Sequence, residues 1–262
     1  MKTTLKLSTL LVAIASAFTF SSCLDSGDDS SYPTYSSYVT ITGDQSMGGY
    51  TFYSDFGSIL RPTSASVQEV LPGLSTSSVK RAYVAFDLAS ETENGKNLES
   101  NKIYDIILRS SYYANYAIPT YETIRHTAES DSLITNNEKV QDINKDIWAI
   151  NGYINALVTL NYYYEEKKST FVMKTYYTED DIDTTNNTLN LNLYYNNLKE
   201  STNAQAQSVI SFKLPEEVIH LNQFTTDSIT LVLNAITGYE NNQLTKVGEC
   251  KVALKDFSEP MF

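Results

Sequence analysis

The chain has 262 residues, 20 of them tyrosine, and a formal net charge of −12 at pH 7. An acidic surface repels phosphate backbones, because nucleic-acid binding depends on cationic side chains that release counterions. Nucleic acid is therefore excluded as an expected partner. Tyrosine combined with many Asn, Thr and Ser residues favours short strands joined by polar turns. The composition thus predicts an all-β protein.

Residues 1–22 are predicted to be a cleaved lipoprotein signal peptide. Two lysines precede an apolar stretch, residues 10–20, that is too short to cross a bilayer as a helix, and small residues follow it. The pattern ends at Cys23, which is typical of the cysteine that bacterial lipoproteins acylate. Each buried acyl methylene contributes roughly 0.8 kcal/mol, so two or three chains would anchor the protein firmly. Cys23 is the predicted lipidation site, and outer-membrane lipid is its predicted partner.

Residues 23–36 are predicted to form a flexible acidic tether. The stretch is rich in Ser and Asp and has few side chains that could pack. Acidic residues this close to the cysteine also resemble the export signal of surface lipoproteins in Bacteroidetes-type bacteria. This resemblance implies a lipid-anchored protein of the cell outer membrane, with the surface-exposed orientation favoured over the periplasm-facing one.

Residues 37–111 are predicted to form an OB-like β-barrel domain. Period-two alternation marks its strands, at residues 38–42, 50–53, 58–62, 79–89 and 102–109. Five strands in so short a segment suit a small, strongly curved barrel. Residues 112–144 are then expected to be a connector, since they lack a strand periodicity and open with a cluster of tyrosines.

Residues 145–258 are predicted to form a β-sandwich domain. Its first strand starts at Trp148 and is too long to be flat, so Gly152 is expected to bend it. The other strands follow at hairpin spacing, at residues 170–177, 188–195, 207–214, 228–235 and 246–254. The predicted fold class is therefore all-β, a small OB-like barrel followed by an antiparallel β-sandwich.

This order of elements resembles the NigD-like lipoproteins of Bacteroidetes-type bacteria. The residues that carry the resemblance are Cys23-Leu24-Asp25, the segment 50–62, the strand 102–108 and the segment 148–155. The resemblance implies an N-terminal OB-like domain, a C-terminal β-sandwich and a secreted lipoprotein of unsettled function. The family takes its name from a bacteriocin gene cluster, which leaves a bacteriocin-associated role open.

The sequence predicts neither catalysis nor metal binding. Ser46 lies in a loop that superficially resembles the surroundings of a hydrolase serine, but its base would have to be His126 or His220. The carboxylates of residues 179–183 lack the central glycine and distal glutamate of a calcium loop. Cys250 is expected to be a buried, inert thiol. We therefore expect no enzyme, no metal and no cofactor.

The binding hypothesis rests on a face of asparagine and tyrosine side chains. Alternate residues of a strand share one face, and three predicted strands each place amides and phenols opposite an apolar set. If these strands are neighbours, they form one nearly uncharged face that could bind a glycan or a protein. A plain solvated sheet face is the alternative. The predicted ligand-binding residues are Asn151, Tyr153, Asn155, Asn161, Tyr163, Lys174, Tyr176, Asn190, Asn192 and Tyr194.

These observations predict a non-catalytic binding or interaction module on a lipid anchor, with a surface glycan or an envelope protein as its partner. The alternative is a structural or accessory subunit of a surface assembly, and a hydrolase is disfavoured. A binding module should be stabilised by its ligand as a monomer. An assembly subunit should instead bury an apolar or edge-strand surface in a stable complex.

Overall fold

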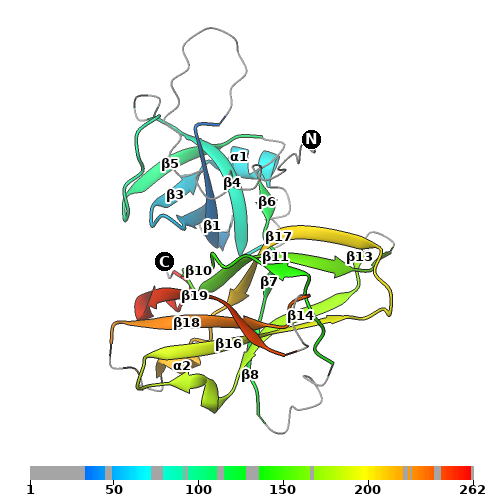
Figure 1. Cartoon of the computed structure of the whole chain (residues 1–262). Helices are drawn as coiled ribbons and strands as arrows, with labels where there is room; N and C mark the ends of the chain where they lie inside the picture. The colour runs from blue at the N-terminus through cyan, green and yellow to red at the C-terminus, as the bar shows by residue number, and fades with distance from the viewer. Residues whose placement is uncertain are drawn as a thin grey trace, which may run out of the picture.

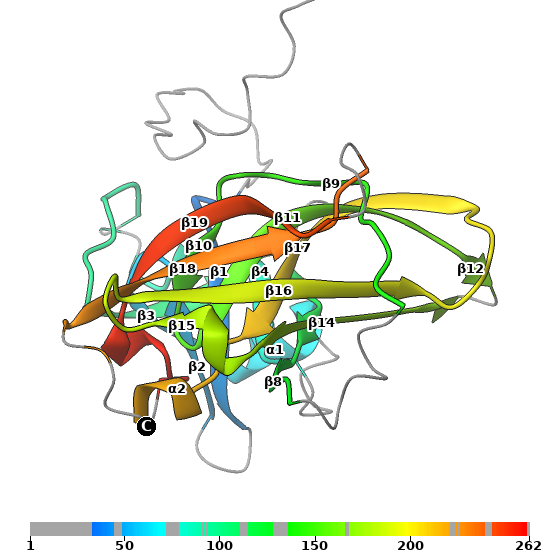
Figure 2. The same cartoon turned by 60° about the horizontal axis from the view of Figure 1, so that its bottom comes forward.

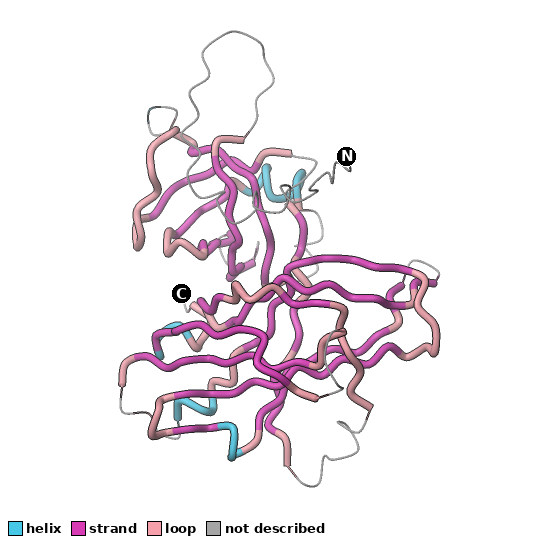
Figure 3. Tube along the Cα trace, viewed as in Figure 1, coloured by secondary structure: helices cyan, strands magenta, loops and turns pink. Residues whose placement is uncertain are grey.

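The structure, a computed structural model, describes residues 33–260 except 45–48, 72–78, 91, 93, 111–114, 128–135, 166–167, 221–223, 225 and 239–242. The predicted signal peptide, Cys23 and most of the predicted tether lie outside the described residues. The described chain forms two domains built almost wholly of strands (Figures 1 and 3). Within it, no helix has the length and apolar character needed to cross a membrane.

The N-terminal domain is a closed five-stranded barrel. Its strands are β1 (Tyr35–Asp44), β2 (Gly49–Ser54), β3 (Ile59–Pro62), β4 (Arg81–Leu88) and β5 (Ile103–Leu108). The neighbours follow the order β1-β2-β3-β5-β4, and β1 also pairs with β4, which closes the barrel. β3 runs parallel to β5. The predicted OB-like barrel is confirmed.

The barrel core comes from alternate residues of the strands. Val84 and Phe86 of β4 and Ile106 of β5 are fully buried and point into it. The helix α1 (Ser64–Val70) connects β3 to β4 and adds Val67 to the same core. The short strand β6 (Tyr116–Ala117) is not one of the five barrel strands, but it pairs with the start of β4, at Ala82 and Tyr83. The residues that alternate along the predicted strands are therefore the ones that fill the barrel core.

The C-terminal domain packs two sheets around a second core. The first contains β10 (Trp148–Ile150), β11 (Tyr153–Tyr162), β17 (Ala204–Lys213), β7 (Thr120–Tyr121) and β9 (Asp142–Ile143). The second contains β19 (Thr245–Ala253), β18 (Ser228–Ala235), β16 (Thr188–Asn197), β14 (Phe171–Tyr177), β8 (Thr123–Arg125) and β15 (Ile182–Asp183). Figure 2 shows β19, β18, β16 and β14 side by side in one layer.

Short elements complete the second domain. They are the hairpin of β12 (Tyr164–Glu165) with β13 (Lys168–Ser169), the helix α2 (Glu217–His220) and the 3₁₀ turns η5 (Glu179–Asp181) and η6 (Leu254–Asp256). The shared core contains Ile154, Leu191, Phe212 and Leu231, all completely buried. The predicted β-sandwich is thereby confirmed.

Three pairs in the sandwich are parallel, so its sheets are mixed. They are β14 with β8, β16 with β18 and β17 with β7. Parallel neighbours cannot be joined by a tight hairpin and need a crossover. β17 makes one of these crossovers, because the chain leaves β16, forms β17 in the other sheet and returns as β18. Residues 112–144, the predicted connector, also supply β7, β8 and β9 to the sandwich.

The prediction of one bent strand starting at Trp148 is wrong, because β10 and β11 form a hairpin. Asn151 and Gly152 make its two-residue turn, with φ values of 54° and 83°. Two consecutive positive φ values define the turn whose twist matches paired strands, and Asn-Gly is its preferred sequence. The turn packs against the C-terminal segment, since the Gly152 amide donates to the carbonyl of Asp256 at 2.7 Å.

Replacing Gly152 with alanine should destabilise the protein more than the same change at Gly95. Both glycines have a positive φ, which costs a residue with a Cβ about 1–2 kcal/mol. At Gly152 the Cβ would also lie 2.8 Å from the amide nitrogen of Glu259, whereas at Gly95 it would meet no atom within 4 Å. Urea unfolding of Gly152→Ala and Gly95→Ala measures the difference. Equal losses in the free energy of unfolding would contradict this packing.

Candidate functional site

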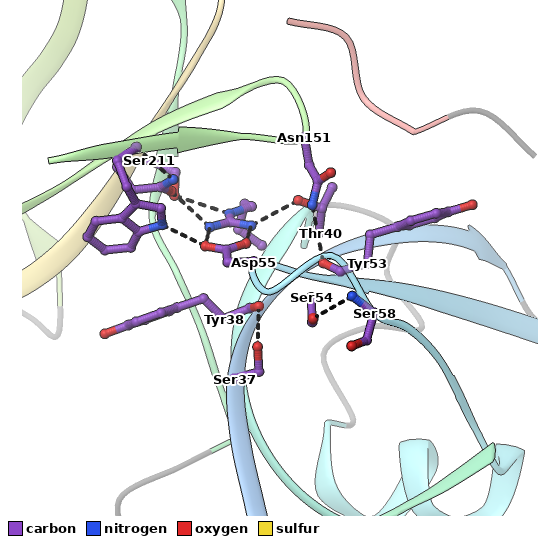
Figure 4. Close-up of polar contacts among 12 residues, drawn as sticks. Ser37, Tyr38, Thr40, Tyr53, Ser54, Asp55, Ser58, Asn151 and Ser211 are labelled. Atoms are coloured by element: carbon purple, nitrogen blue, oxygen red, sulfur yellow. Dashed lines mark hydrogen bonds and ion pairs between the residues drawn. The ribbon is translucent and has the colours of Figure 1, made fainter. Parts of the chain in front are cut away.

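The two domains meet at a buried polar cluster centred on Arg81. Figure 4 labels Thr40, Asp55 and Ser211 of this cluster. Arg81 is the first residue of β4 and is completely inaccessible to solvent. Its guanidinium forms a two-point ion pair with Asp55, with Nη1–Oδ1 and Nη2–Oδ2 distances of 2.6 and 2.8 Å. Pairs of this bidentate geometry are among the strongest polar contacts in proteins. Both members belong to the barrel.

A tight turn between β2 and β3 brings Asp55 to the junction. The amide of Asp55 donates to the carbonyl of Tyr38 at 2.9 Å, which fixes the turn to β1. Ser54 and Ser58 close the turn through a backbone hydrogen bond of 2.9 Å, and both residues are fully buried. The carboxylate is therefore held by the backbone of the barrel and points toward the sandwich (Figure 4).

The sandwich supplies the remaining partners of this ion pair. Arg81 donates from Nη2 to Asn155 Oδ1 at 2.9 Å and from Nε to Ser211 Oγ at 3.5 Å. Trp148 of β10 donates from Nε1 to Asp55 Oδ2 at 2.7 Å. Ser211 in turn donates to Asn155 Oδ1 at 2.6 Å. Each domain thus satisfies charges and dipoles of the other.

All five N–H donors of the guanidinium have an acceptor. Nη1 donates to Thr40 Oγ1 at 2.9 Å in addition to Asp55, which completes the set. Among the described residues, no buried side-chain nitrogen or oxygen lacks a hydrogen-bond partner. A buried charge costs several kcal/mol unless it is paired and hydrogen-bonded. The placement of the domains in this structure supplies every one of these partners. We call this set of residues, Thr40, Asp55, Arg81, Trp148, Asn155 and Ser211, the domain lock.

The C-terminal segment packs beside the domain lock. Tyr153 lies with its ring 5.7 Å from the Arg81 guanidinium carbon and donates its hydroxyl to Glu259 Oε1 at 2.8 Å. Burial, with the nearby Glu259 carboxylate as a further cause, raises the pKa of Tyr153 well above its usual value. Lys213 lies 3.8 Å from the same carboxylate. Tyr153 therefore stays protonated and serves as a structural donor.

The ten predicted ligand-binding residues do not form one face, and this part of the prediction is wrong. β11 pairs with β17 in one sheet, whereas β14 pairs with β16 in the other. Tyr153 and Asn155 of β11 are buried in the domain junction. Asn151 lies in the hairpin turn and donates to the carbonyl of Tyr53 at 3.4 Å. These three polar residues therefore face the barrel domain and not the solvent.

Asn161 lies near the other end of β11, away from the junction, and Tyr163 directly follows the strand. Asn161 donates to Gln141 Oε1 at 2.8 Å and accepts from Gln205 at 2.9 Å. The Tyr163 ring lies 5.6 Å from the ammonium of Lys199. Both side chains are partly exposed. Their role in ligand binding remains a prediction.

The other five predicted residues do come together on the outer face of the second sheet. Lys174 lies directly opposite Tyr194, with its ammonium 5.0 Å from the ring centroid, and Tyr176 lies opposite Asn192. Asn190 is the next outward residue along β16. Tyr176, Asn192 and Tyr194 are nevertheless less than a tenth exposed.

The turn η5 covers part of this outer face. Asn192 donates to the carboxylate of Asp181 at 3.2 Å and accepts from Asn234 at 3.0 Å, and Asn190 donates to the Asp181 carbonyl at 3.4 Å. The same carboxylate accepts from the amide and hydroxyl of Thr178 at 2.8 Å. These amides are therefore occupied by internal hydrogen bonds, and ligand binding by this set remains a prediction.

The other chemically reactive residues have structural surroundings where the structure describes them. The His126 ring packs edge-on against Tyr176 at 5.9 Å. Burial raises the pKa of Cys250 to about 12, so its thiol carries almost no thiolate near neutrality. Ser46 and the side chain of His220 lie outside the described residues. Within the described chain, no group of three or more His, Cys, Asp or Glu residues is placed to hold a metal ion.

Sequence reasoning missed the domain lock. Its available signals were an arginine inside a strand and a lone tryptophan at the start of another. Neither signal names a partner, because Arg81 and Asn155 are 74 positions apart. Two segments that carry the family resemblance, residues 50–62 and 148–155, do meet here through Asp55 and Trp148.

A closed barrel of OB strand order locked to a mixed β-sandwich defines the class of this protein. Residues 122–247 match the family model of the NigD-like C-terminal beta sandwich domain. This segment is therefore a NigD-like C-terminal domain, and the resemblance seen in the sequence is confirmed. No curated protein sequence gives a significant match.

Three solved structures from Bacteroides species share this fold. A NigD-like immunity protein from Bacteroides caccae is 14% identical, covers 85% of this chain and 99% of its own, and has a TM-score of 0.52. A candidate lipoprotein from Bacteroides fragilis is 14% identical, covers 84% and 97%, and has a TM-score of 0.53. A protein of unknown function from Bacteroides vulgatus is 18% identical, covers 86% and 90%, and has a TM-score of 0.52. At these identities the likeness shows the fold alone.

Replacing Arg81 with methionine should destabilise the protein by about 3–5 kcal/mol, because it leaves the buried Asp55 carboxylate without its cation. Arg109→Met is the matched control, since it breaks an ion pair with Asp87 whose arginine side chain is 44% exposed. That change should cost about 1 kcal/mol or less. Chemical denaturation measures both values. Similar losses for the two variants would mean that the domain lock carries no special energetic weight.

Proposed function

We propose that this chain is a non-catalytic, lipid-anchored protein of the cell outer membrane that acts as a rigid interaction module. The observation that carries the proposal is the domain lock, in which Arg81 uses every donor on groups from both domains. Two domains held in one orientation present a preorganised surface, and preorganisation lowers the entropic cost of binding. The proposed partner is a surface glycan or an envelope protein.

The anchor of the proposed module is acylated Cys23. The supporting observations are the signal-like N-terminus with its cysteine and the candidate lipoprotein among the proteins of the same fold. The described chain begins on the barrel, where the amide of Thr34 donates to Asp87 Oδ1 at 2.8 Å. Asp87 also accepts from Arg109 at 2.7 Å, so the end of the tether is fixed to the barrel wall. The barrel would thus be the domain nearer the lipid along the chain.

An accessory subunit of a surface assembly is the second candidate, because one strand edge favours it. β17 pairs with β11 along its whole length, but on its other side the described chain pairs only Ser211 and Phe212, with β7. Residues 204–212 contain no charge and no proline. Charged side chains and proline usually protect an open strand edge against pairing with another chain, and this edge has neither. The NigD-like immunity protein from Bacteroides caccae also keeps a bacteriocin-associated role among the candidates.

A thermal-shift screen tests the proposed function. The mature chain carrying Cys23→Ser should be a monomer whose midpoint temperature rises with either the polysaccharide or the protein fraction of the cell envelope. Ligand at about 100 times its dissociation constant adds about 2.7 kcal/mol, which shifts the midpoint of a domain of this size by about 5 °C or more. If neither fraction shifts the midpoint and the native acylated protein is extracted in a stable complex, the assembly role replaces the proposal.

A further inference from the structure

We propose that a row of four aromatic side chains across the domain junction binds an uncharged glycan chain. The row consists of Trp148 from the sandwich and Tyr38, Tyr83 and Tyr116 from the barrel, and we call it the aromatic row. The inference rests on the proposed function and deepens it, since it names the surface and the class of ligand. The row is distinct from the ten residues that the sequence predicts as ligand-binding.

The four rings follow one another at nearly even spacing. Ring centroids are 5.4 Å apart from Trp148 to Tyr38, 4.8 Å from Tyr38 to Tyr83 and 5.6 Å from Tyr83 to Tyr116. Strand pairing explains the order, because Tyr38 lies opposite Tyr83 and Tyr83 lies opposite Tyr116. The row therefore runs across β10, β1, β4 and β6 and joins one domain to the other.

The aromatic row lies on the outside of the barrel. Successive residues of a strand point to opposite faces, and the neighbours Val39, Ala82 and Val84 are completely buried in the barrel core. Tyr116 is 42% exposed, and the other three members are partly exposed. A row of rings on the outer wall can contact a ligand without opening the core.

The domain lock holds the aromatic row in place. The hydrogen bond of 2.7 Å from its Nε1 to Asp55 fixes the indole of Trp148. At the barrel end, the Tyr83 hydroxyl donates to Ser36 Oγ at 2.9 Å. Rings that are already fixed lose little conformational entropy when a ligand arrives. The same ion pair that orients the domains therefore also orients the first ring of the row.

The chemistry of the row favours an uncharged sugar polymer. Aromatic faces are electron-rich and attract the C–H bonds on the flat face of a sugar ring, while tyrosine hydroxyls can pair with sugar hydroxyls. No member of the row is charged, and Asp55, the carboxylate that Trp148 contacts, is paired with Arg81. The net charge of −12 disfavours an acidic polysaccharide.

The size of the row also favours a glycan over a protein. A stable protein interface buries about 800 Å² on each partner and takes in some 20–30 residues. The aromatic row is a single line of four side chains, which suits a polymer one sugar ring wide. A protein partner would have to extend well beyond it, and the experiment below separates the two.

Trp148 provides the readout, because it is the only tryptophan in the chain. The mature chain carrying Cys23→Ser is titrated with hexasaccharides of glucose in α and β linkage and of mannose, and with an acidic hexasaccharide of galacturonate. We expect at least one neutral hexasaccharide to change the Trp148 emission in a saturable way, and the acidic one to bind more weakly. The double variant Tyr83→Ser, Tyr116→Ser should weaken that binding about tenfold or more.

Two controls separate loss of contact from loss of fold. Tyr164→Ser removes a tyrosine that is 47% exposed on the sandwich outside the row, and it should leave the affinity unchanged. Tyr116→Phe keeps the ring and should retain most of the affinity, and the midpoint temperature of each variant shows that it folds. A saturable response that the double variant does not weaken overturns the proposal, and so does the lack of any emission change with every hexasaccharide.

The outcomes also separate this inference from the proposed function. If an envelope fraction raises the midpoint temperature but no hexasaccharide changes the emission of Trp148, the module binds elsewhere or binds protein. The aromatic row is then overturned while the proposed function stands. If no envelope fraction stabilises the protein and no hexasaccharide changes the emission, both proposals fall.

Discussion

The buried guanidinium of Arg81 is the constraint on which the arrangement of this protein depends. A cation with no contact to solvent must find an acceptor for every donor, and here the acceptors come from a barrel turn, a barrel strand and two sandwich strands. A relative rotation of the domains would leave Asn155 and Ser211 out of reach and would leave the charge partly unsatisfied. The hydrogen bonds from Arg81 to Asn155 and Ser211, and from Trp148 to Asp55, therefore fix the orientation of one domain on the other.

The sequence was enough to predict which segments form strands, but it was not enough to predict which strands pair with each other. Alternation of apolar residues marks the barrel strands, since Val84, Phe86 and Ile106 all reach the core. It could not show that β16 and β18 are parallel neighbours, because that depends on β17 crossing to the other sheet. The Asn151-Gly152 hairpin carried a strong local signal, but a run of apolar residues on both sides concealed the reversal of the chain.

The predicted ligand-binding face shows why polar periodicity alone is ambiguous. In β11 the polar face is turned toward the second domain, where Asn155 becomes part of the domain lock. In β16 the amide of Asn192 is taken up by the turn that holds Asp181. A polar residue on a strand can thus face solvent, a neighbouring domain or a covering turn. Only the tertiary partners decide between these, and the sequence does not record them locally.

Two of the segments that resemble NigD-like proteins also supply residues of the domain lock. The segments 50–62 and 148–155 carry the resemblance to NigD-like proteins, and Asp55 and Trp148 within them bond to each other across the junction. What these segments determine is the placement of one domain on the other. The aromatic row follows from that placement, because Trp148 reaches Tyr38 only when the domains are locked.

The most direct test of this account is to measure residual dipolar couplings of the mature chain carrying Cys23→Ser in a weakly aligned sample. If the domain lock holds, one alignment tensor fits the backbone amides of the barrel and of the sandwich together, with both domains oriented as in the structure. Two tensors of different magnitude would show that the domains move independently. That result would contradict the claim that the domain lock holds them as one unit.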